Sequence, residues 1–486
     1  MIIYQMLPRL LGKRDWVKGG SYERNGCGKL NDISPELLSR LRSDLAVDAV
    51  WYTGVIAHAT KTDFAGRPAN NHSLVKGEAG SPYAITDYYD VAACLASTPE
   101  KGMQEFEALV ERTHSAGMKV IIDFVPNHVF RQFGKPFSIV NFYVLNGHVL
   151  KLPFESDYIE DPALGTGNNP SSDSPGFYDW YETVKLNYNN KYTWNVMRDI
   201  LLFWAGKGVD GFRCDMCELV PSEFFDWVTK EVRSEYPDTL FIAEIYDKGN
   251  YRRYADAGFD YLYDKTGFYD ALRAISTFNR PASWLTDEWL FTGSLQPRML
   301  KFLENHDEQR VASDFWLGDG RRAIAPLAVS LLFDTSPFMI YMGQEYGERG
   351  MNEEGYSGRD GRTSIFDYCS LSEEKDEWLY GRYSSLMRLA SSPLFSEGKT
   401  FDLMYANPAG EWFDPGRQFA FMRGLDGCGA LVVANFDDKA VDVKVNVNRE
   451  CLEYLGLEPD PAFSKTLHIG PNDVVIVKNE TYEQSV

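Results

Sequence analysis

Four acidic residues stand at the ends of apolar runs, where carboxyl groups could be brought together for acid–base chemistry. They are Asp123 in VIIDFV, Asp215 in GFRCD, Glu244 in LFIAEI and Asp307 in LENHDEQR. Arg213 precedes Asp215 by two residues, which places both side chains on the same side of a strand. Converging carboxyl groups repel one another, so one keeps its proton while another, beside an arginine, stays ionised. Glycosidic cleavage needs this division, an acid for the leaving oxygen and a carboxylate at the sugar carbon.

Two other kinds of chemistry deserve comparison with this one. His128 and His306 stand beside the same acids, so metal-assisted hydrolysis on clustered acids and imidazoles is an alternative. Cys214 and Cys217 flank Asp215 at Cys-x-x-Cys spacing. A zinc site would need further ligands close by, and a redox motif would need a thioredoxin-like unit; the sequence supplies neither. We therefore interpret the two cysteines as small buried residues.

An alternation of strand-like and helix-like segments must position these side chains. Short apolar or β-branched runs predict strands at 2–7, 49–54, 120–125, 211–215, 240–245, 259–264, 300–305 and 338–343. Helical spacing of apolar residues appears between them, at 99–117, 191–208 and 222–237. This alternation predicts an α/β fold, a parallel (β/α)8 TIM barrel, with a doubly wound open sheet as the alternative. In such a barrel the reacting groups lie at the carboxyl ends of the strands, where the acids stand.

Two regions interrupt the alternation. Residues 129–188 contain GTGNNPSSDSPG without a strong helical pattern, and they are too long for an ordinary loop. From about residue 397 helices cease, and short period-two runs predict an antiparallel β-sandwich. The predicted domains are a catalytic barrel of 1–128 and 189–396, a small inserted domain of 129–188 after the third strand, and a C-terminal β-sandwich of 397–486.

The composition restricts the class of partner. The chain has 70 acidic and 49 basic residues and a net charge of −21, which repels nucleic acids and anionic membranes and favours a neutral substrate. No run approaches the roughly 20 apolar residues of a membrane span, and the first residues lack signal-peptide features. Seven scattered cysteines do not suggest a disulfide framework. We expect a cytoplasmic location, with a trimmed form of a secreted protein as the alternative, and leave the oligomeric state open.

Several short stretches together resemble a known family. DFVPNH, GFRCD, AEIY and ENHD, in this order, resemble the conserved regions of the α-amylase family of glycoside hydrolases. SPYAITDYYDV, KLNYNN and YMGQEYGE look like further stretches of that family. The resemblance covers residues 1 to about 395, and the predicted sandwich after them is similar to the family's C-terminal domain.

The resemblance implies a role for each acid. Asp215 matches the family's nucleophile, Glu244 its acid/base, and Asp307 the carboxylate that stabilises the transition state. Arg213 matches the arginine that keeps the nucleophile charged. The family works with retention, which predicts about 5–5.5 Å between the carboxyl groups of Asp215 and Glu244. Asp123 is expected to bond within the site without touching the cleaved bond.

Three further residues match substrate-binding positions of the family. His128 and His306 match histidines that hydrogen-bond sugar hydroxyls, and Tyr83 matches the aromatic residue on which a sugar ring stacks. Exo-acting α-glucosidases of the family often have an aspartate three residues before that tyrosine. Gly80 stands there in this chain, which argues against a strict α-glucosidase.

The sequence departs from the family at the positions that follow the nucleophile. Many amylases have Lys-His there, which helps to bind sugar and a structural calcium, whereas this chain has Glu218 and Leu219. Asn127 matches a common calcium ligand, but calcium wants about six to eight oxygens. We therefore expect no obligatory calcium, no catalytic metal and no other cofactor.

These observations together predict an enzyme. We expect a retaining glycoside hydrolase that cleaves α-glucosidic bonds, first of all α-1,4 bonds of malto-oligosaccharides or starch-like glucans, through a covalent glycosyl-Asp215 intermediate. A transglycosylase that uses the same residues is an alternative, and so is a non-catalytic sugar-binding relative. The exact substrate and the choice between endo and exo action stay open.

Overall fold

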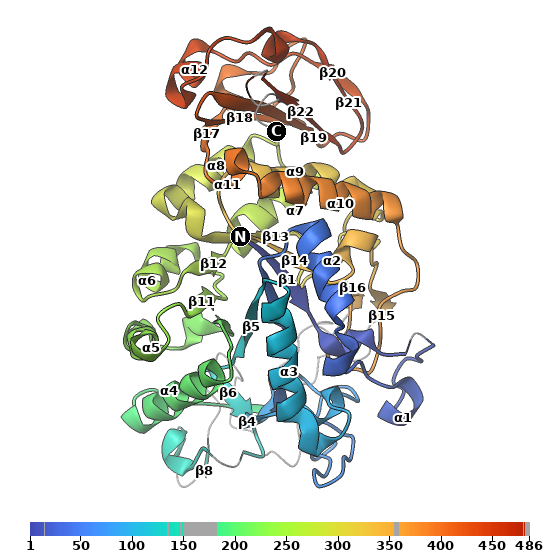
Figure 1. Cartoon of the computed structure of the whole chain (residues 1–486), viewed down its shortest axis with the longest axis vertical. Helices are drawn as coiled ribbons and strands as arrows, with labels where there is room; N and C mark the ends of the chain where they lie inside the picture. Colours follow the sequence, from blue (N-terminus) through green and yellow to red (C-terminus); the bar gives the residue numbers. More distant parts are fainter. Residues whose placement is uncertain are drawn as a thin grey trace.

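Eight parallel strands form a closed barrel at the centre of the molecule (Figure 1). The structure is a computed structural model, and it describes residues 1–13, 15–133, 136–142, 144–145, 148–149, 182–353, 359–479 and 481. The barrel strands, in order around the ring, are β1 (Ile2–Met6), β14 (Phe338–Tyr341), β13 (Met299–Phe302), β12 (Tyr261–Tyr263), β11 (Leu240–Ala243), β10 (Gly211–Cys214), β5 (Lys119–Phe124) and β2 (Ala49–Tyr52). Each of the eight predicted strands is found, so the closed barrel is confirmed and the open sheet is wrong.

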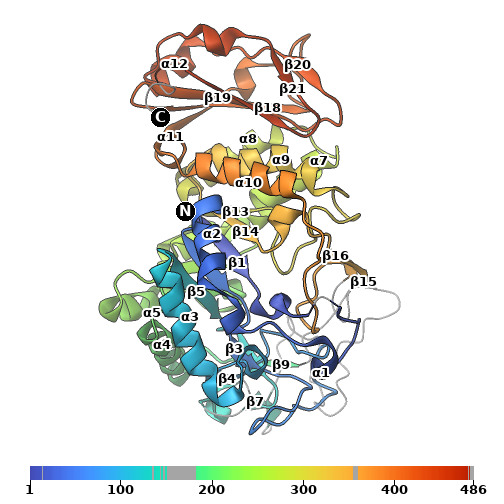
Figure 2. The ribbon, with the colours of Figure 1, turned by 45° about the vertical axis from the view of Figure 1, so that its right-hand side comes forward.

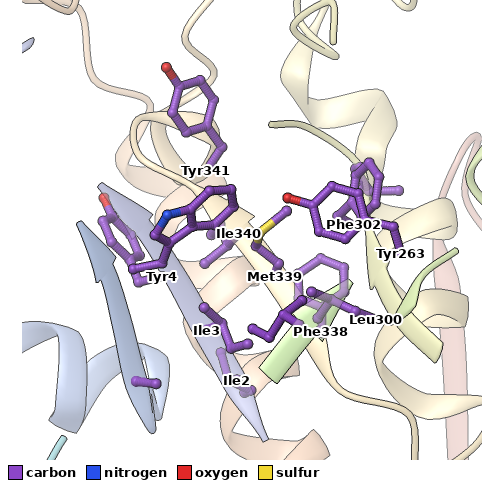
Figure 3. Close-up of a cluster of buried hydrophobic side chains, with 14 of the residues drawn as sticks. Ile2, Ile3, Tyr4, Tyr263, Leu300, Phe302, Phe338, Met339, Ile340 and Tyr341 are labelled. Atoms are coloured by element: carbon purple, nitrogen blue, oxygen red, sulfur yellow. The ribbon is translucent and has the colours of Figure 1, made fainter. Parts of the chain in front are cut away.

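The strands are short apolar runs because both of their faces are covered. Figure 3 shows buried side chains of β1, β13 and β14 packed close together, and Ile3, Leu300 and Met339 among them are fully buried. Helices cover the outside of the ring: α2 (Pro35–Leu45), α3 (Gly102–Ser115), α4 (Lys191–Gly206), α5 (Ser222–Glu235), α6 (Tyr251–Asp256), α7 (Asp270–Ser276), α8 (Trp284–Thr292), α9 (Ile324–Leu332) and α10 (Glu377–Ala390). A strand buried on both faces has no polar side to show to water, which is the usual condition in parallel sheets.

The three predicted helices are found as α3, α4 and α5, each with ends within a few residues of the expected bounds. In α3, Phe106, Leu109 and Val110 are buried on one face, and Gly117 beyond its end has φ +76°, a conformation that favours glycine. In α4, the Asn190 side chain accepts a hydrogen bond from the Tyr192 amide at 3.0 Å and so caps the first turn. None of the described helices is both long and apolar enough to cross a bilayer.

Short antiparallel pairs lie beyond the strand ends. The strands β3 (Ile56–His58) and β4 (Ile85–Val91) pair after β2, and β6 (His128–Phe130) pairs with β9 (Thr183–Lys185) after β5. Two-residue strands β7 (Val144–Leu145) and β8 (His148–Val149) pair with each other, and β15 (Met351–Glu353) pairs with β16 (Arg359–Arg362). The predicted inserted domain of 129–188 lies for the most part outside the described residues, and its boundaries stay a prediction.

The C-terminal part consists of antiparallel sheets, as predicted. A four-stranded sheet has the order β17 (Lys399–Asp402), β18 (Gln418–Leu425), β19 (Cys428–Asn435) and β22 (Val474–Lys478), and β20 (Val441–Val443) pairs with β21 (Leu467–Ile469). Both views show these sheets at one end of the molecule, next to α8 and α9 (Figures 1 and 2). The expectation that helices cease from about residue 397 is wrong at α12 (Arg449–Leu455), whereas α11 (Pro393–Ser396) ends before this limit.

The helix α12 escaped prediction because it is short. It has seven residues, of which only Cys451 and Leu455 are buried. Fewer than three turns give little helical periodicity to recognise. The Asn448 side chain accepts a hydrogen bond from the Cys451 amide at 3.0 Å, so the cap starts the helix where the apolar pattern does not.

Candidate active site

The carboxyl ends of four barrel strands bring the predicted acids together. Asp123 lies near the end of β5, Asp215 directly follows β10, and Glu244 directly follows β11. Arg213 on β10 is in register with Asp123 on β5, so the two side chains come from neighbouring strands. Parallel strands of equal tilt present their ends at one mouth of the barrel, which explains why distant carboxyl groups meet.

The three acids with predicted catalytic roles line one cavity. Asp215, Glu244 and Asp307 face a cavity of about 350 Å³, a size that suits a small organic ligand. The other described residues that line it are Lys76, Ser81, Tyr83, His128, Glu182, Thr183, Met216, Tyr246, Ile365 and Phe366. Asp215 and Glu244 are almost completely buried in the wall of this cavity.

Arg213 joins the carboxyl groups from behind the cavity. Its guanidinium is fully buried, with Nη1 2.8 Å from Asp215 Oδ1 and Nη2 2.6 Å from Glu244 Oε1. Nη1 also lies 3.4 Å from Asp123 Oδ1. A planar guanidinium can serve several carboxylates at once, and its positive charge offsets part of their mutual repulsion.

Burial and crowding determine the protonation of Asp215. Burial, followed by the neighbouring Glu244 carboxylate, raises the pKa of Asp215 well above its ordinary value, and the Arg213 ion pair opposes both effects. Its Oδ2 atom is buried and has no hydrogen-bond partner among the described residues. His128 Nε2 lies 3.9 Å from this oxygen. Oδ2 is therefore available to a ligand in the cavity.

Glu244 receives one donor on each carboxyl oxygen from the adjoining loops. The Met216 amide donates to Oε2 at 2.6 Å, and the Tyr246 hydroxyl donates to Oε1 at 2.9 Å. Together with Arg213 these contacts hold the carboxyl group in one orientation at the cavity wall.

A chain of hydrogen bonds supports the tyrosine predicted to stack on sugar. Burial, followed by the charge of Arg213, lowers the pKa of His306 well below its ordinary value, so the imidazole is neutral. Gln5 Nε2 donates to His306 Nδ1 at 2.7 Å, and His306 Nε2 contacts the Tyr83 hydroxyl. That hydroxyl donates to Asp123 Oδ1 at 3.3 Å. The rings of Tyr83 and His306 stack with centroids 5.3 Å apart, which fixes the tyrosine against the cavity.

Asp123 makes its contacts behind the cavity. Its Oδ2 accepts hydrogen bonds from Trp51 Nε1 at 3.2 Å and from the Gly54 amide at 3.3 Å. Burial raises the pKa of Asp123 to about 6, while Arg213 lowers it. These contacts support the expected structural role.

Most of the predicted site residues come together, although not all of them at the cavity. Tyr83, His128 and the three acids line it, whereas Arg213 and His306 lie behind them. The structure adds a buried ion pair between Lys76 Nζ and Glu182 Oε1 at 2.8 Å in the cavity wall. No motif marks that pair in the sequence. Tyr246 lies within AEIY, one of the stretches that resemble the α-amylase family, but a tyrosine at this position does not by itself predict a role.

A third buried cation, in addition to Arg213 and Lys76, is Lys185. Lys185 is the last residue of β9, and its Nζ donates to the Leu219 carbonyl at 2.9 Å and to Asn127 Oδ1. It thereby joins the loop after β5 to the loop that follows Asp215. KLNYNN resembles a stretch of the α-amylase family, but its residue types do not predict this contact.

The cysteines beside Asp215 are buried, which confirms their interpretation as packing residues. Cys214 and Cys217 are fully buried free thiols, and Cys217 Sγ donates to the Glu244 carbonyl at 3.0 Å. All seven cysteines of the sequence lie in the described part of the chain, and none of them forms a disulfide.

Comparison with known proteins agrees with this geometry. The family model described as "Alpha amylase, catalytic domain" matches residues 22–377, so the chain belongs to the α-amylase family. Among curated proteins, the "Alpha-amylase MalA" of Haloarcula japonica is 26% identical over 321 residues, which are 64% of this chain and 40% of that protein. An "Alpha-1,4-glucan:maltose-1-phosphate maltosyltransferase" of Cereibacter sphaeroides is 28% identical over 255 residues, 50% of this chain and 36% of that protein.

The fold is also found in solved structures. A maltogenic α-amylase, AmyB, from Thermotoga neapolitana superposes with a TM-score of 0.67 at 20% identity, over 99% of this chain and 98% of that one. At this identity the likeness establishes the fold. The chain spans less than half the length of the two curated relatives named above.

Proposed function

We propose that this chain is a retaining glycoside hydrolase that cleaves α-glucosidic bonds, first of all α-1,4 bonds of malto-oligosaccharides or starch-like glucans. The observation that carries the proposal is that Asp215, Glu244 and Asp307 line one cavity with Arg213 behind two of them. Two carboxyl groups that face a single cation compete for one proton, and the reaction uses the form in which Glu244 holds the proton and Asp215 is ionised against Arg213. The names of the relatives agree with glucan substrates.

The proposed reaction has two steps. Asp215 Oδ2 attacks the anomeric carbon while Glu244 protonates the leaving oxygen, so that a glycosyl ester forms on Asp215. Water then attacks the same carbon, Glu244 takes its proton, and the ester bond breaks with overall retention. Asp307 and His128 lie in the cavity wall, where they can accept and donate hydrogen bonds to sugar hydroxyls. Arg213 stabilises the carboxylate that leaves in the second step.

Product analysis with maltoheptaose tests the proposal. Wild type should give shorter malto-oligosaccharides, and Asp215→Asn should lose at least about a thousandfold in rate, because an amide cannot act as the nucleophile. Asp199→Asn is a matched control, since its side chain is half exposed on α4. Unchanged melting temperatures would show that both variants fold. Normal turnover by Asp215→Asn would remove that residue from the nucleophile role.

A transglycosylase is the second candidate, and a relative named as a maltosyltransferase favours it. The same glycosyl ester would then be attacked by a sugar hydroxyl in place of water. Products longer than maltoheptaose, accumulating before the shorter ones, would identify transfer as the main reaction.

We also propose that the enzyme needs no calcium. The observation that supports this is the Lys185 ammonium, which takes the Asn127 side-chain oxygen that the family resemblance relates to calcium. The Lys185 ammonium gives the Asn127 oxygen a positively charged partner, so a metal ion is not needed at that oxygen. Activity and melting temperature should be unchanged after dialysis against a chelator. A loss that added calcium restores would overturn this proposal.

We also propose a cytoplasmic location and a neutral glucan as the partner. The net charge of −21 supports a neutral glucan as partner and opposes nucleic acid or an anionic membrane surface. Seven cysteines without a disulfide among them support a location in the reducing cytoplasm. Fractionation of the native host, with immunodetection of the protein in the cytosol and the medium, tests the location.

A further inference from the structure

Glu218 occupies the position where many family members have a lysine, and the structure gives it a different task. It lies in the single turn of Cys217–Leu219, three residues beyond Asp215. Its Oε2 accepts a hydrogen bond from the Tyr246 amide at 2.7 Å, and both of its oxygens accept from the Asp247 amide at 3.2 Å. The Asn250 side chain donates to Oε1 at 3.0 Å. Three donors from residues 246–250 thus converge on one carboxylate.

Those donors all belong to the loop that follows the proposed acid/base. Glu244 directly follows the strand β11, and the 246–250 segment comes immediately after it. The Tyr246 hydroxyl donates to Glu244 Oε1 at 2.9 Å, and its ring lies in the cavity wall. The Thr266 hydroxyl donates to the Tyr246 carbonyl at 2.6 Å, which fixes the backbone of this residue from the other side.

The loop that carries Glu218 also reaches Glu244 directly. The Met216 amide donates to Glu244 Oε2 at 2.6 Å, and the Lys185 ammonium holds the Leu219 carbonyl of the same loop at 2.9 Å. Each oxygen of Glu244 is therefore held by one of two loops, and Glu218 joins these loops through three donors.

We infer that Glu218 is a positioning residue, which acts through Tyr246 to orient the Glu244 carboxyl group toward the leaving oxygen. This inference rests on the proposed function. Three backbone and amide donors on a carboxylate form charge-assisted hydrogen bonds, which are short and directional. A carboxyl acid that is displaced by about 1 Å loses much of its ability to transfer a proton. A negative charge at this position thus organises the acid, where a lysine could not accept any of these hydrogen bonds.

A positioning role for Glu218 predicts different effects of its substitution on two substrates. Departure of an oligosaccharide requires a proton from Glu244, whereas fluoride leaves from α-maltosyl fluoride without one. A residue that acts through the acid should therefore matter for maltoheptaose and much less for the fluoride. kcat/KM reports the first irreversible step, glycosylation of Asp215, for both substrates.

The experiment measures kcat/KM for both substrates with wild type, Glu218→Ala, Glu218→Gln and Tyr246→Phe. We expect Glu218→Ala to lose about tenfold or more on maltoheptaose and less than about threefold on the fluoride. Glu218→Gln, which keeps one acceptor oxygen, should fall between wild type and Glu218→Ala. Tyr246→Phe should repeat the distinction between substrates.

Glu223→Ala on α5 is the matched control, because that side chain is 70% exposed; both of its rates should equal those of wild type. Equal losses on the two substrates, or no loss on either, would overturn the inference while leaving the proposed function in place. If Glu218→Ala did not fold, Tyr246→Phe, which removes one hydroxyl, would decide. Wild type that turned over neither substrate would overturn the proposed function and this inference with it.

Discussion

At the scale of single residues, one buried guanidinium forms ion pairs with three carboxyl groups of the site. Arg213 lies against Asp123, Asp215 and Glu244, so each carboxylate receives only part of its positive charge. Buried carboxylates that are incompletely compensated hold their protons to higher pH. The raised pKa values of Asp215 and Asp123 follow from this arrangement.

Asp123→Asn should change how stability depends on pH. Burial raises the pKa of Asp123 to about 6 in the folded protein, so between about pH 4 and pH 6 the folded state holds a proton that the unfolded chain has lost. Stability contributed by this group is present at about pH 4 and is lost as the pH rises through 6. We expect the wild type to lose on the order of 3 kcal/mol relative to the variant across this window. Calorimetry of both proteins from about pH 4 to pH 8 measures the difference; a constant difference would contradict the expectation.

Residue types at strand ends made most of this site predictable. Asp215, Glu244 and Arg213 could be identified because a charged residue within a buried apolar run is costly unless it has a task. Lys76 and Glu182 could not, since each stands alone in a loop and only the folding of the chain brings them into contact. Glu218 was noticed as a departure, but its hydrogen bonds to the loop after β11 depend on loop geometry that no spacing reveals.

At the scale of elements, the loops at the strand ends are tied to one another by buried polar side chains. Lys185 closes β9 and holds both the Asn127 side chain after β5 and the Leu219 carbonyl after β10. Glu218 continues the connection from the same loop to the loop after β11. Loops fixed in this way can keep catalytic groups in place although they carry little apolar surface of their own.

Lys185→Met should loosen this connection. The change keeps most of the apolar volume but removes the donor that Asn127 and Leu219 share, which should cost about 1–3 kcal/mol for each buried oxygen affected. We expect a lower melting temperature and a lower kcat/KM for maltoheptaose. Lys230→Met, at a lysine that is 71% exposed on α5, is the control and should leave both unchanged. If the Lys185→Met protein were as stable and as active as wild type, the Lys185 ammonium would not be needed to hold the Asn127 and Leu219 loops in place.

The elements themselves were largely predictable. Every barrel strand is a short apolar run, and the amphipathic pattern of α3 runs over three turns, so period and length identify both. The short helix α12 could not be predicted, because its two buried residues fit a strand or a loop equally well. Where an element is too short for its period to repeat, caps and tertiary contacts decide its structure.

At the scale of the whole molecule, one buried arginine joins the C-terminal sheets to the barrel. Arg423 on β18 donates to the carbonyls of Leu332 at 2.7 Å, Phe395 at 2.9 Å and Gly398 at 2.7 Å. Burial lowers its pKa to about 10, so it remains charged at neutral pH. Phe333 packs beside these contacts, with its ring edge against Phe419 of the same strand.

Arg423→Met should weaken the whole molecule. Several buried carbonyls would lose their donor together, and removing one partner of such a buried network costs about 3–5 kcal/mol. We expect a lower melting temperature and calorimetric unfolding in two transitions, the C-terminal sheets melting before the barrel. Arg449→Met on α12, where the side chain is 90% exposed, serves as the control and should melt as wild type. A single transition at the wild-type temperature would mean that other contacts suffice.

The covalent intermediate on Asp215 is the most direct test of the central claim. Glu244→Gln, supplied with α-maltosyl fluoride, should form the glycosyl ester, because fluoride needs no proton to leave. The ester should then persist, because no base activates water. Mass spectrometry of the digested protein should find one maltosyl group on Asp215. A maltosyl group on another residue, or no adduct while the variant still releases fluoride, would contradict the account.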